Sequence, residues 1–178
     1  TGATYRVVEF LEQEALITRT PRGPIDAVRW PELLRRWSQD YGFTRSNRVR
    51  SFLSPRGVTA LTTGLAMLSD VRYAVTGSIA AAQWAPYAPA AAAMIYTDDT
   101  DRLAELLNLR PVDSGANVMI ATAAYDAVFD RAENTDGITV VAPSQAVVDL
   151  LTGPGRSPAE AQALLEWMEQ HVQQWRRQ

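Results

Sequence analysis

The hydrophobic and polar positions near the start of the chain predict a helix followed by a β-hairpin. Val7, Phe10 and Leu11 recur at helical spacing, and charged residues fall on the opposite face. Two short β-type runs follow at 16–19 and 25–30, separated by the turn sequence PRGP. A helix that runs into a two-stranded hairpin with an arginine in its loop has the outline of a recognition helix and its wing.

The pattern changes twice more in the first third of the chain. Pro31 suits the first turn of another helix, which Gly42 is expected to end. Residues 44–57 are polar, basic and rich in turn residues, with a strand expected over 49–53. We therefore expect residues 44–57 to be the junction between two domains.

The remaining residues alternate between strand-like and helix-like segments. Expected strands are 73–76, 92–97, 117–122 and 138–141, and expected helices are 58–68, 78–84, 101–109, 144–151 and 157 to about 175. Such alternation predicts an α/β or α+β fold. The predicted organisation is the recognition helix, wing and following helix of a partial winged helix domain in 1–43, a junction in 44–57, and a mixed α/β domain in 58–178.

The amino-acid composition excludes several kinds of functional site. The chain has no cysteine, which excludes disulfides, thiolate zinc sites and a cysteine nucleophile. All 17 basic residues are arginine. No apolar run is long enough to cross a membrane, so a cytoplasmic protein without a membrane partner is expected.

The net charge of −3 is unevenly distributed. Residues 1–56 hold ten arginines and six acidic residues, whereas residues 57–178 hold seven arginines and fourteen acidic residues. A basic head on an acidic body favours an anionic partner for the head, such as nucleic acid. The alternative is a chance imbalance on a solvated surface.

Five residues are the candidates for contact with double-stranded DNA. The N-terminal end of a recognition helix faces base edges and phosphates, and the wing reaches the flanking backbone. These positions hold Thr4, Tyr5 and Arg6 in the helix, and Arg19 and Arg22 in the hairpin. The alternative is an ordinary helix and hairpin with arginines on the surface.

A second candidate is a vestigial nucleotide site. Gly77 and Ser78 follow one expected strand, and Asp98 and Asp99 follow the next. Nucleotidyltransferases place a Gly-Ser turn against a triphosphate and use two carboxylates to hold Mg²⁺. Adjacent carboxylates on a strand point to opposite faces, so no catalytic residue, metal or cofactor is predicted. The alternative is that one aspartate caps the next helix.

Three other features give weaker indications of a function. His171, the only histidine, is expected on or near the surface of the last helix rather than in a Ser-His-Asp triad. Asp149 is a candidate functional carboxylate, with a solvated or capping role as the default. The aromatic, proline-rich segment 84–89 is either a surface for a protein partner or a lid over the core, and a lid is favoured.

The chain resembles a known family over nearly its whole length. The stretch TYRVVEFLEQEALITRTPRGPIDAVRWPELLRRW looks like the second half of a winged helix-turn-helix. The segments RYAVTGSIAAAQWAPYAP, LRPVDSGANVMI and VAPSQAVVDLLTGPGRSPAEAQALLEWM resemble the C-terminal region of actinobacterial regulators in the AbiEi antitoxin family of type IV toxin–antitoxin systems. The body also resembles a degenerate nucleotidyltransferase-like fold.

The resemblance implies a DNA-binding transcriptional regulator that represses its own operon and has a cognate toxin. Winged regulators often form homodimers. A complete winged domain has two helices before the recognition helix, so a fragment of a longer protein is expected. Two alternatives remain, a nucleotidyltransferase-like enzyme and a module that neutralises a toxin without touching DNA.

Overall fold

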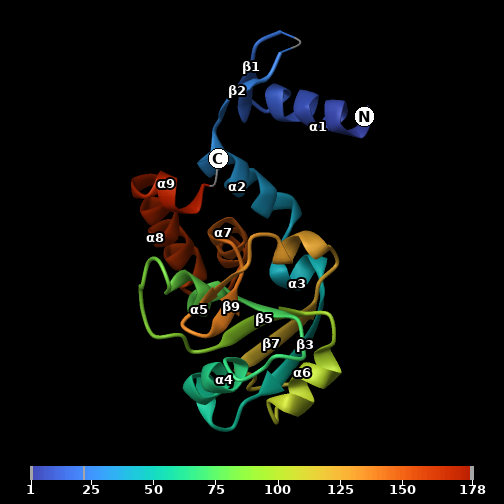
Figure 1. Ribbon diagram of the computed structural model, residues 1–178, viewed down its shortest axis with the longest axis vertical. Helices are drawn as coiled ribbons and strands as arrows, with labels where there is room; N and C mark the ends of the chain where they lie inside the picture. Colours follow the sequence, from blue (N-terminus) through green and yellow to red (C-terminus); the bar gives the residue numbers. More distant parts are fainter. Residues whose placement is uncertain (1, 22, 177–178) are drawn as a thin grey trace. The chain divides into compact units, whose positions relative to one another are not determined.

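The chain divides into two compact units. The computed structural model describes residues 2–21 and 23–176 (Figure 1). Unit 1 is Thr1–Asp40 and unit 2 is Tyr41–Gln178. The two units are described separately below.

Unit 1 has the predicted order of helix, hairpin and helix. Its elements are α1 (Gly2–Gln13), β1 (Ile17–Arg19), β2 (Ile25–Val28) and α2 (Trp30–Asp40). The two strands pair antiparallel, with Ile17 opposite Val28. After α1, Ala15 has a positive φ of 54°, and the amide of Leu16 donates to the carbonyl of Leu11 over 2.9 Å. This turn ends the helix and leads directly into the hairpin.

The helix α1 buries less apolar surface than its sequence predicts. None of its residues is buried, and Val7 and Phe10 are 56% and 42% exposed. Val8, not Val7, faces the hairpin, where it lines a shallow pocket with Arg19 and residues 23–25. The predicted inward face is therefore wrong for Val7 and Phe10, because the hairpin packs beside a neighbouring face of the helix.

Unit 2 is built on one mixed seven-stranded sheet. Its strands are β3 (Arg48–Leu53), β4 (Tyr73–Thr76), β5 (Ala93–Thr97), β6 (Arg110–Pro111), β7 (Val118–Thr122), β8 (Glu133–Thr135) and β9 (Ile138–Val140). Their spatial order is β6-β3-β7-β5-β4-β9-β8. The pairs β5–β7 and β4–β9 are parallel and the others antiparallel. The fold of the chain is therefore of the predicted mixed α/β class.

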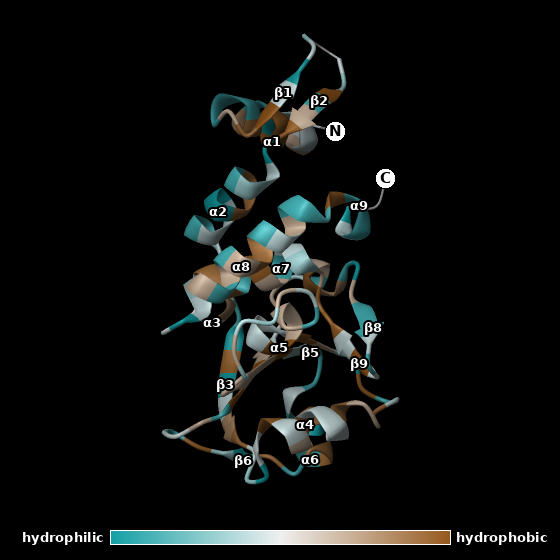
Figure 2. Cartoon of the chain, turned by 90° about the vertical axis from the view of Figure 1, so that its left-hand side faces the viewer, coloured by the Kyte–Doolittle hydropathy of each residue, from teal (hydrophilic) through white to brown (hydrophobic). Residues whose placement is uncertain are grey.

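Helices cover both faces of this sheet. They are α3 (Phe43–Ser46), α4 (Gly57–Leu65), α5 (Gly77–Ala81), α6 (Thr100–Leu106), α7 (Pro143–Leu151), α8 (Ser157–Gln170) and α9 (Val172–Trp175), with a 3₁₀ turn at Asp126–Phe129. Figures 1 and 2 show α4 and α6 on one face and α7 and α8 on the other. Because both faces are covered, the central strands β4 and β5 are buried throughout.

The segment expected to be a junction is part of unit 2. Residues 44–57 contain most of α3 and all of β3, and β3 lies in the sheet between β6 and β7. The segment looks polar because Arg48, Arg50 and Ser51 are exposed, while Phe52 is only 1% exposed. Partial burial of a strand near the sheet edge thus gives a sequence that resembles a linker.

Two smaller differences concern the C-terminal half. The expected last helix is interrupted at His171, which has φ −125° and ψ 37° and separates α8 from α9. The short strands β6 and β8 were not predicted. None of the helices in the described part of the chain is both long and apolar enough to span a membrane.

Candidate nucleic-acid interface

Three of the predicted DNA-contact residues lie together on unit 1. Thr4 and Tyr5 of α1 and Arg19 of β1 line one shallow pocket of about 210 Å³ beside the hairpin. Tyr5 is 64% exposed, and Thr4 is exposed as well. Arg22 lies outside the described residues. The helix and the hairpin therefore present polar side chains to solvent along one shared surface.

Arg6 differs from the other described arginines of unit 1. It is exposed and does not line the pocket beside Tyr5. Its guanidinium has no ion-pair or hydrogen-bond partner among the described residues. Arg19, in contrast, holds the Glu12 carboxylate at 2.8 Å, with its side chain only 18% exposed. Arg6 is thus available to an anion without breaking an existing contact, and Arg19 is not.

The positive charge of the N-terminal segment is located differently from the expectation. Residues 1–40 hold six arginines and six acidic residues, so the formal charge of unit 1 is zero. The whole excess lies in residues 41–56, which hold Arg45, Arg48, Arg50 and Arg56 and no acidic residue. These four arginines belong to the start of unit 2, so the predicted basic head does not coincide with the winged segment.

The predicted nucleotide site is not assembled. Gly77 and Ser78 follow the carboxyl end of β4, and Asp98 and Asp99 follow the carboxyl end of β5. These strands are antiparallel, with Tyr73 opposite Thr97 and Thr76 opposite Met94. The two pairs of residues therefore lie at opposite ends of the strand pair, roughly 10 Å or more apart.

Each half of that motif has a local structural role. Gly77 has φ +65°, and a Cβ at this position would lie 2.9 Å from the Met94 sulfur, so the turn requires glycine. Asp99 is the N-cap of α6, where a carboxylate oxygen accepts from the amide of Arg102 over 2.9 Å. The helix-capping interpretation of the aspartates is therefore confirmed for Asp99.

Sequence reasoning missed a buried polar cluster around Asp149, for which it favoured a solvated or capping role. Asp149 on α7 is 0% exposed. Its carboxylate accepts hydrogen bonds from the hydroxyls of Thr76 over 2.6 Å and Tyr96 over 2.9 Å, and from the amide of Gln145 over 3.1 Å. Burial raises the pKa of Asp149 to about 7, while these three hydrogen bonds act in the opposite direction.

The cluster extends to the first residues of unit 2. The hydroxyls of Tyr96 and Tyr41 are 2.7 Å apart, and the Asn47 amide donates to the Tyr41 oxygen over 3.0 Å. Because Tyr96 donates its proton to Asp149, Tyr41 must donate to Tyr96. Burial raises the pKa of both tyrosines, so they remain protonated donors. Tyr41 and Tyr96 are far from Asp149 in sequence, so no sequence pattern indicated this arrangement.

The other sequence candidates are on or near the surface. His171 is half-buried at the end of α8, where its ring stacks on Trp167 with centroids 4.8 Å apart. Pro86, Tyr87 and Pro89 are exposed. The favoured interpretation of segment 84–89 as a lid over the core is therefore wrong, because no residue of the segment is fully buried and Trp84 is half-buried.

Comparisons with known proteins give one match. No significant match was found among curated proteins or solved structures. A family model described as "Transcriptional regulator, AbiEi antitoxin, Type IV TA system" matches residues 27–172. This range covers most of the chain, including the sheet of unit 2, but it begins after α1 and β1. The chain belongs to the AbiEi antitoxin family of type IV toxin–antitoxin systems, a family of transcriptional regulators.

Proposed function

We propose that the protein binds operator DNA through unit 1 and represses the operon that encodes it. The observation that carries the proposal is the exposure of Thr4, Tyr5 and Arg6 on α1, next to a hairpin that holds Arg19. A recognition helix needs such exposed polar residues at its N-terminal end, with a wing beside it. All five predicted contact residues lie before the part of the chain that the family model matches.

Arg6 is expected to make the strongest single contact. A guanidinium without a protein partner can bind guanine or phosphate without first breaking an ion pair. Arg19 would have to leave Glu12, so its net contribution to DNA affinity is expected to be smaller. The arginine-rich start of unit 2 would add affinity that does not depend on base sequence.

The proposal is tested with a fluorescent duplex that carries the promoter of the protein's own operon. Arg6→Ala is expected to weaken binding by about 1–3 kcal/mol and to reduce the slope of log K against log salt by about 0.9. The matched control is Arg102→Ala, which removes an exposed arginine from α6. Equal affinities for wild type and Arg6→Ala would remove Arg6 from the interface. Absence of binding to any duplex would contradict the proposal itself.

A cognate toxin is the second proposed partner, and a homodimer is the proposed binding form. For the nucleotidyltransferase alternative, the separation of Ser78 from Asp98 and Asp99 offers no support. A reporter fused to the promoter separates a DNA-binding repressor from a module that acts on the toxin alone. Repression that Arg6→Ala relieves would favour the repressor.

A further inference from the structure

An open pocket between α4 and α6 of unit 2 contains none of the five predicted DNA-contact residues. Its volume is about 590 Å³, which is within the range of small-molecule sites in proteins. The pocket is lined by the turn before α4, by α4 itself, by the end of α6 and by the first residue of β6. We call it the α4–α6 pocket and ask which ligand its lining would accept.

One wall of the α4–α6 pocket is apolar. The two helical segments approach closely because Gly64 has no side chain, and a Cβ at this position would lie 3.0 Å from the Leu107 Cδ2 atom. Leu61 is buried, and Leu106 and Leu107 are half-buried. An apolar group of a ligand would therefore be removed from water against these three leucines, which favours its binding.

Two arginines supply all the formal charge of the pocket lining. Arg110 lies opposite Leu53 in the β3–β6 pair, and Arg56 follows Leu53 by three residues, so the sheet register brings both arginines to one pocket. Both are exposed, and neither guanidinium has an ion-pair or hydrogen-bond partner among the described residues. No acidic residue is among those that line the pocket. The lining therefore carries a formal charge of +2.

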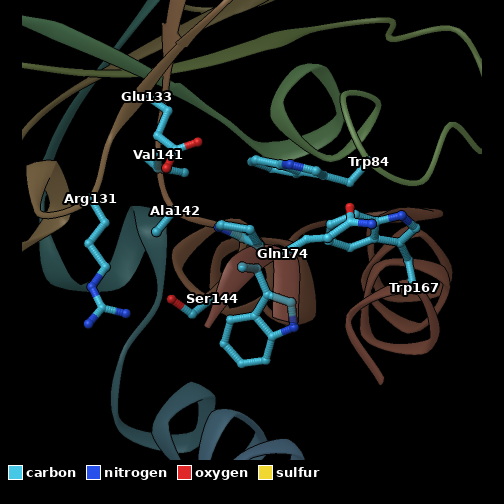
Figure 3. A pocket seen from close by; sticks show the side chains of 10 residues that line it. Trp84, Arg131, Glu133, Val141, Ala142, Ser144, Trp167 and Gln174 are labelled. Carbon is cyan, nitrogen blue, oxygen red and sulfur yellow. The ribbon is translucent and has the colours of Figure 1, made fainter. Parts of the chain in front are cut away.

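A second cavity of unit 2 has a different lining. Its volume is about 160 Å³, and it is lined by tryptophans and by Arg131 and Glu133, which carry opposite charges (Figure 3). Opposite charges on one lining do not favour an anion over a cation. The α4–α6 pocket is larger and carries positive charge only, so it favours an anionic ligand.

The number of charges and the apolar wall together select the ligand class. A carboxylate or a phosphate diester carries one negative charge, whereas a phosphate monoester carries nearly two at pH 7. Guanidinium groups bind phosphate oxygens through paired, charge-assisted hydrogen bonds. We propose that the α4–α6 pocket binds small phosphate monoesters that have an apolar body. The phosphate pairs with Arg56 and Arg110. The apolar body lies against Leu61, Leu106 and Leu107.

Calorimetric titration of the full chain with 1-naphthyl phosphate tests the proposal. Saturable binding is expected at about 0.15 M salt, where attraction between distant exposed charges is largely screened. Among related compounds, 1-naphthoate has only one charge, inorganic phosphate has no apolar body, and dimethyl phosphate imitates a nucleic-acid backbone. Each is expected to bind at least tenfold more weakly. The titration contains no DNA, so its outcome is independent of operator binding.

Arginine variants test the recognition of the phosphate. Arg56→Gln and Arg110→Gln are each expected to weaken binding of 1-naphthyl phosphate at least tenfold and to remove its preference over 1-naphthoate. Arg48→Gln is the matched control. Arg48 is exposed and belongs to the same arginine-rich start of unit 2, but it does not line the pocket. This variant should bind 1-naphthyl phosphate like the wild type.

Tryptophan variants test the occupation of the pocket without changing its charge. Ala60 is an exposed residue of α4 that lines the pocket, so Ala60→Trp is expected to fill the space and weaken binding more than tenfold. Thr59→Trp places the same ring at the preceding exposed position, which does not line the pocket, and should retain binding. Circular dichroism of every variant verifies that the protein is folded.

Three results would overturn the proposal. One is no saturable binding of 1-naphthyl phosphate by the folded protein. Another is an equal loss of binding in Arg48→Gln, Arg56→Gln and Arg110→Gln, since this would show attraction to surface charge without use of the pocket. A third is equal binding of dimethyl phosphate and 1-naphthyl phosphate, which would assign the two pocket arginines to contact with a nucleic-acid backbone.

Discussion

Units 1 and 2 both contain helices and strands, but their polar side chains form ion pairs and hydrogen bonds in different environments. In unit 1, α1 has no buried residue, and the ion pairs from Arg19, Arg29 and Arg36 lie at the surface. In unit 2, the central strands are fully buried, and a carboxylate is enclosed with three hydrogen-bond donors. The ion pairs of unit 1 thus lie at its surface, whereas unit 2 also encloses polar contacts among its packed side chains.

This difference agrees with the proposed role of unit 1 in DNA binding. A surface that binds DNA needs exposed polar groups, and such groups contribute little to stability. A sheet covered on both faces holds its buried side chains in fixed positions, and their packing contributes strongly to stability. The comparison predicts that substitutions of the same chemical type have unequal effects in the two units.

The largest expected effect comes from a matched pair of isoleucines. Ile120 in β7 is 0% exposed and Ile25 in β2 is 46% exposed. Ile120→Ala is expected to lower the free energy of unfolding of unit 2 by about 4 kcal/mol, because it leaves a cavity in the packed sheet. Ile25→Ala is expected to cost less than about 1 kcal/mol. Urea unfolding monitored by circular dichroism measures both. Equal losses for the two variants would contradict the comparison.

The second effect is a dependence of stability on pH through Asp149. Burial raises the pKa of Asp149 from its ordinary value of 3.8 to about 7 in the folded protein, so the folded state binds the extra proton between these pH values. The contribution of Asp149 to stability is therefore fully present below pH 4 and is lost as the pH rises towards 7 and above. Between pH 5 and 8 the loss of this contribution is expected to be on the order of 2–3 kcal/mol.

Asp149→Asn removes the titrating group and keeps its size. We expect this variant to lose most of the decrease in stability between pH 5 and 8, as measured by urea unfolding at each pH. Asp98→Asn is the control, since the Asp98 side chain is 58% exposed. A pH profile of Asp149→Asn that parallels the wild type would show that Asp149 does not titrate in this range.

The sequence was sufficient for the order of the main elements but not for the sites. Buried strands such as Tyr73–Thr76 are short apolar runs between turn signals, and the expected bounds match the structure. By contrast, Arg48 and Arg50 lie on the same side of β3 as the buried Phe52, so β3 lacks the apolar run of a buried strand, and its place inside the sheet depends on β6 and β7. The hydrophobic and polar pattern of one strand does not show which strands will lie beside it in the sheet.

Long-range pairing also explains the errors in chemistry. The Gly77-Ser78 and Asp98-Asp99 pairs looked like one site because each follows a strand, and only the antiparallel register separates them. The Asp149 cluster joins four residues that are far apart in sequence. They are Tyr41 in a loop, Thr76 in β4, Tyr96 in β5 and Asp149 in α7. The exposed residues of α1 are a different case, since Thr4, Tyr5 and Arg6 lie on the surface where the sequence placed them.

The smallest expected effect concerns the ion pair between Arg19 and Glu12, which links the hairpin to α1. Its nitrogen–oxygen distance is 2.8 Å, but the Glu12 side chain is 43% exposed. A double-mutant cycle with Arg19→Met and Glu12→Gln is expected to give a coupling energy of about 0.5 kcal/mol in unfolding. In DNA binding, Glu12→Gln alone should strengthen affinity for the promoter, because it releases the Arg19 guanidinium. A coupling energy above about 2 kcal/mol, with unchanged DNA affinity, would mean that Arg19 belongs to the fold of unit 1 and not to its DNA-binding surface.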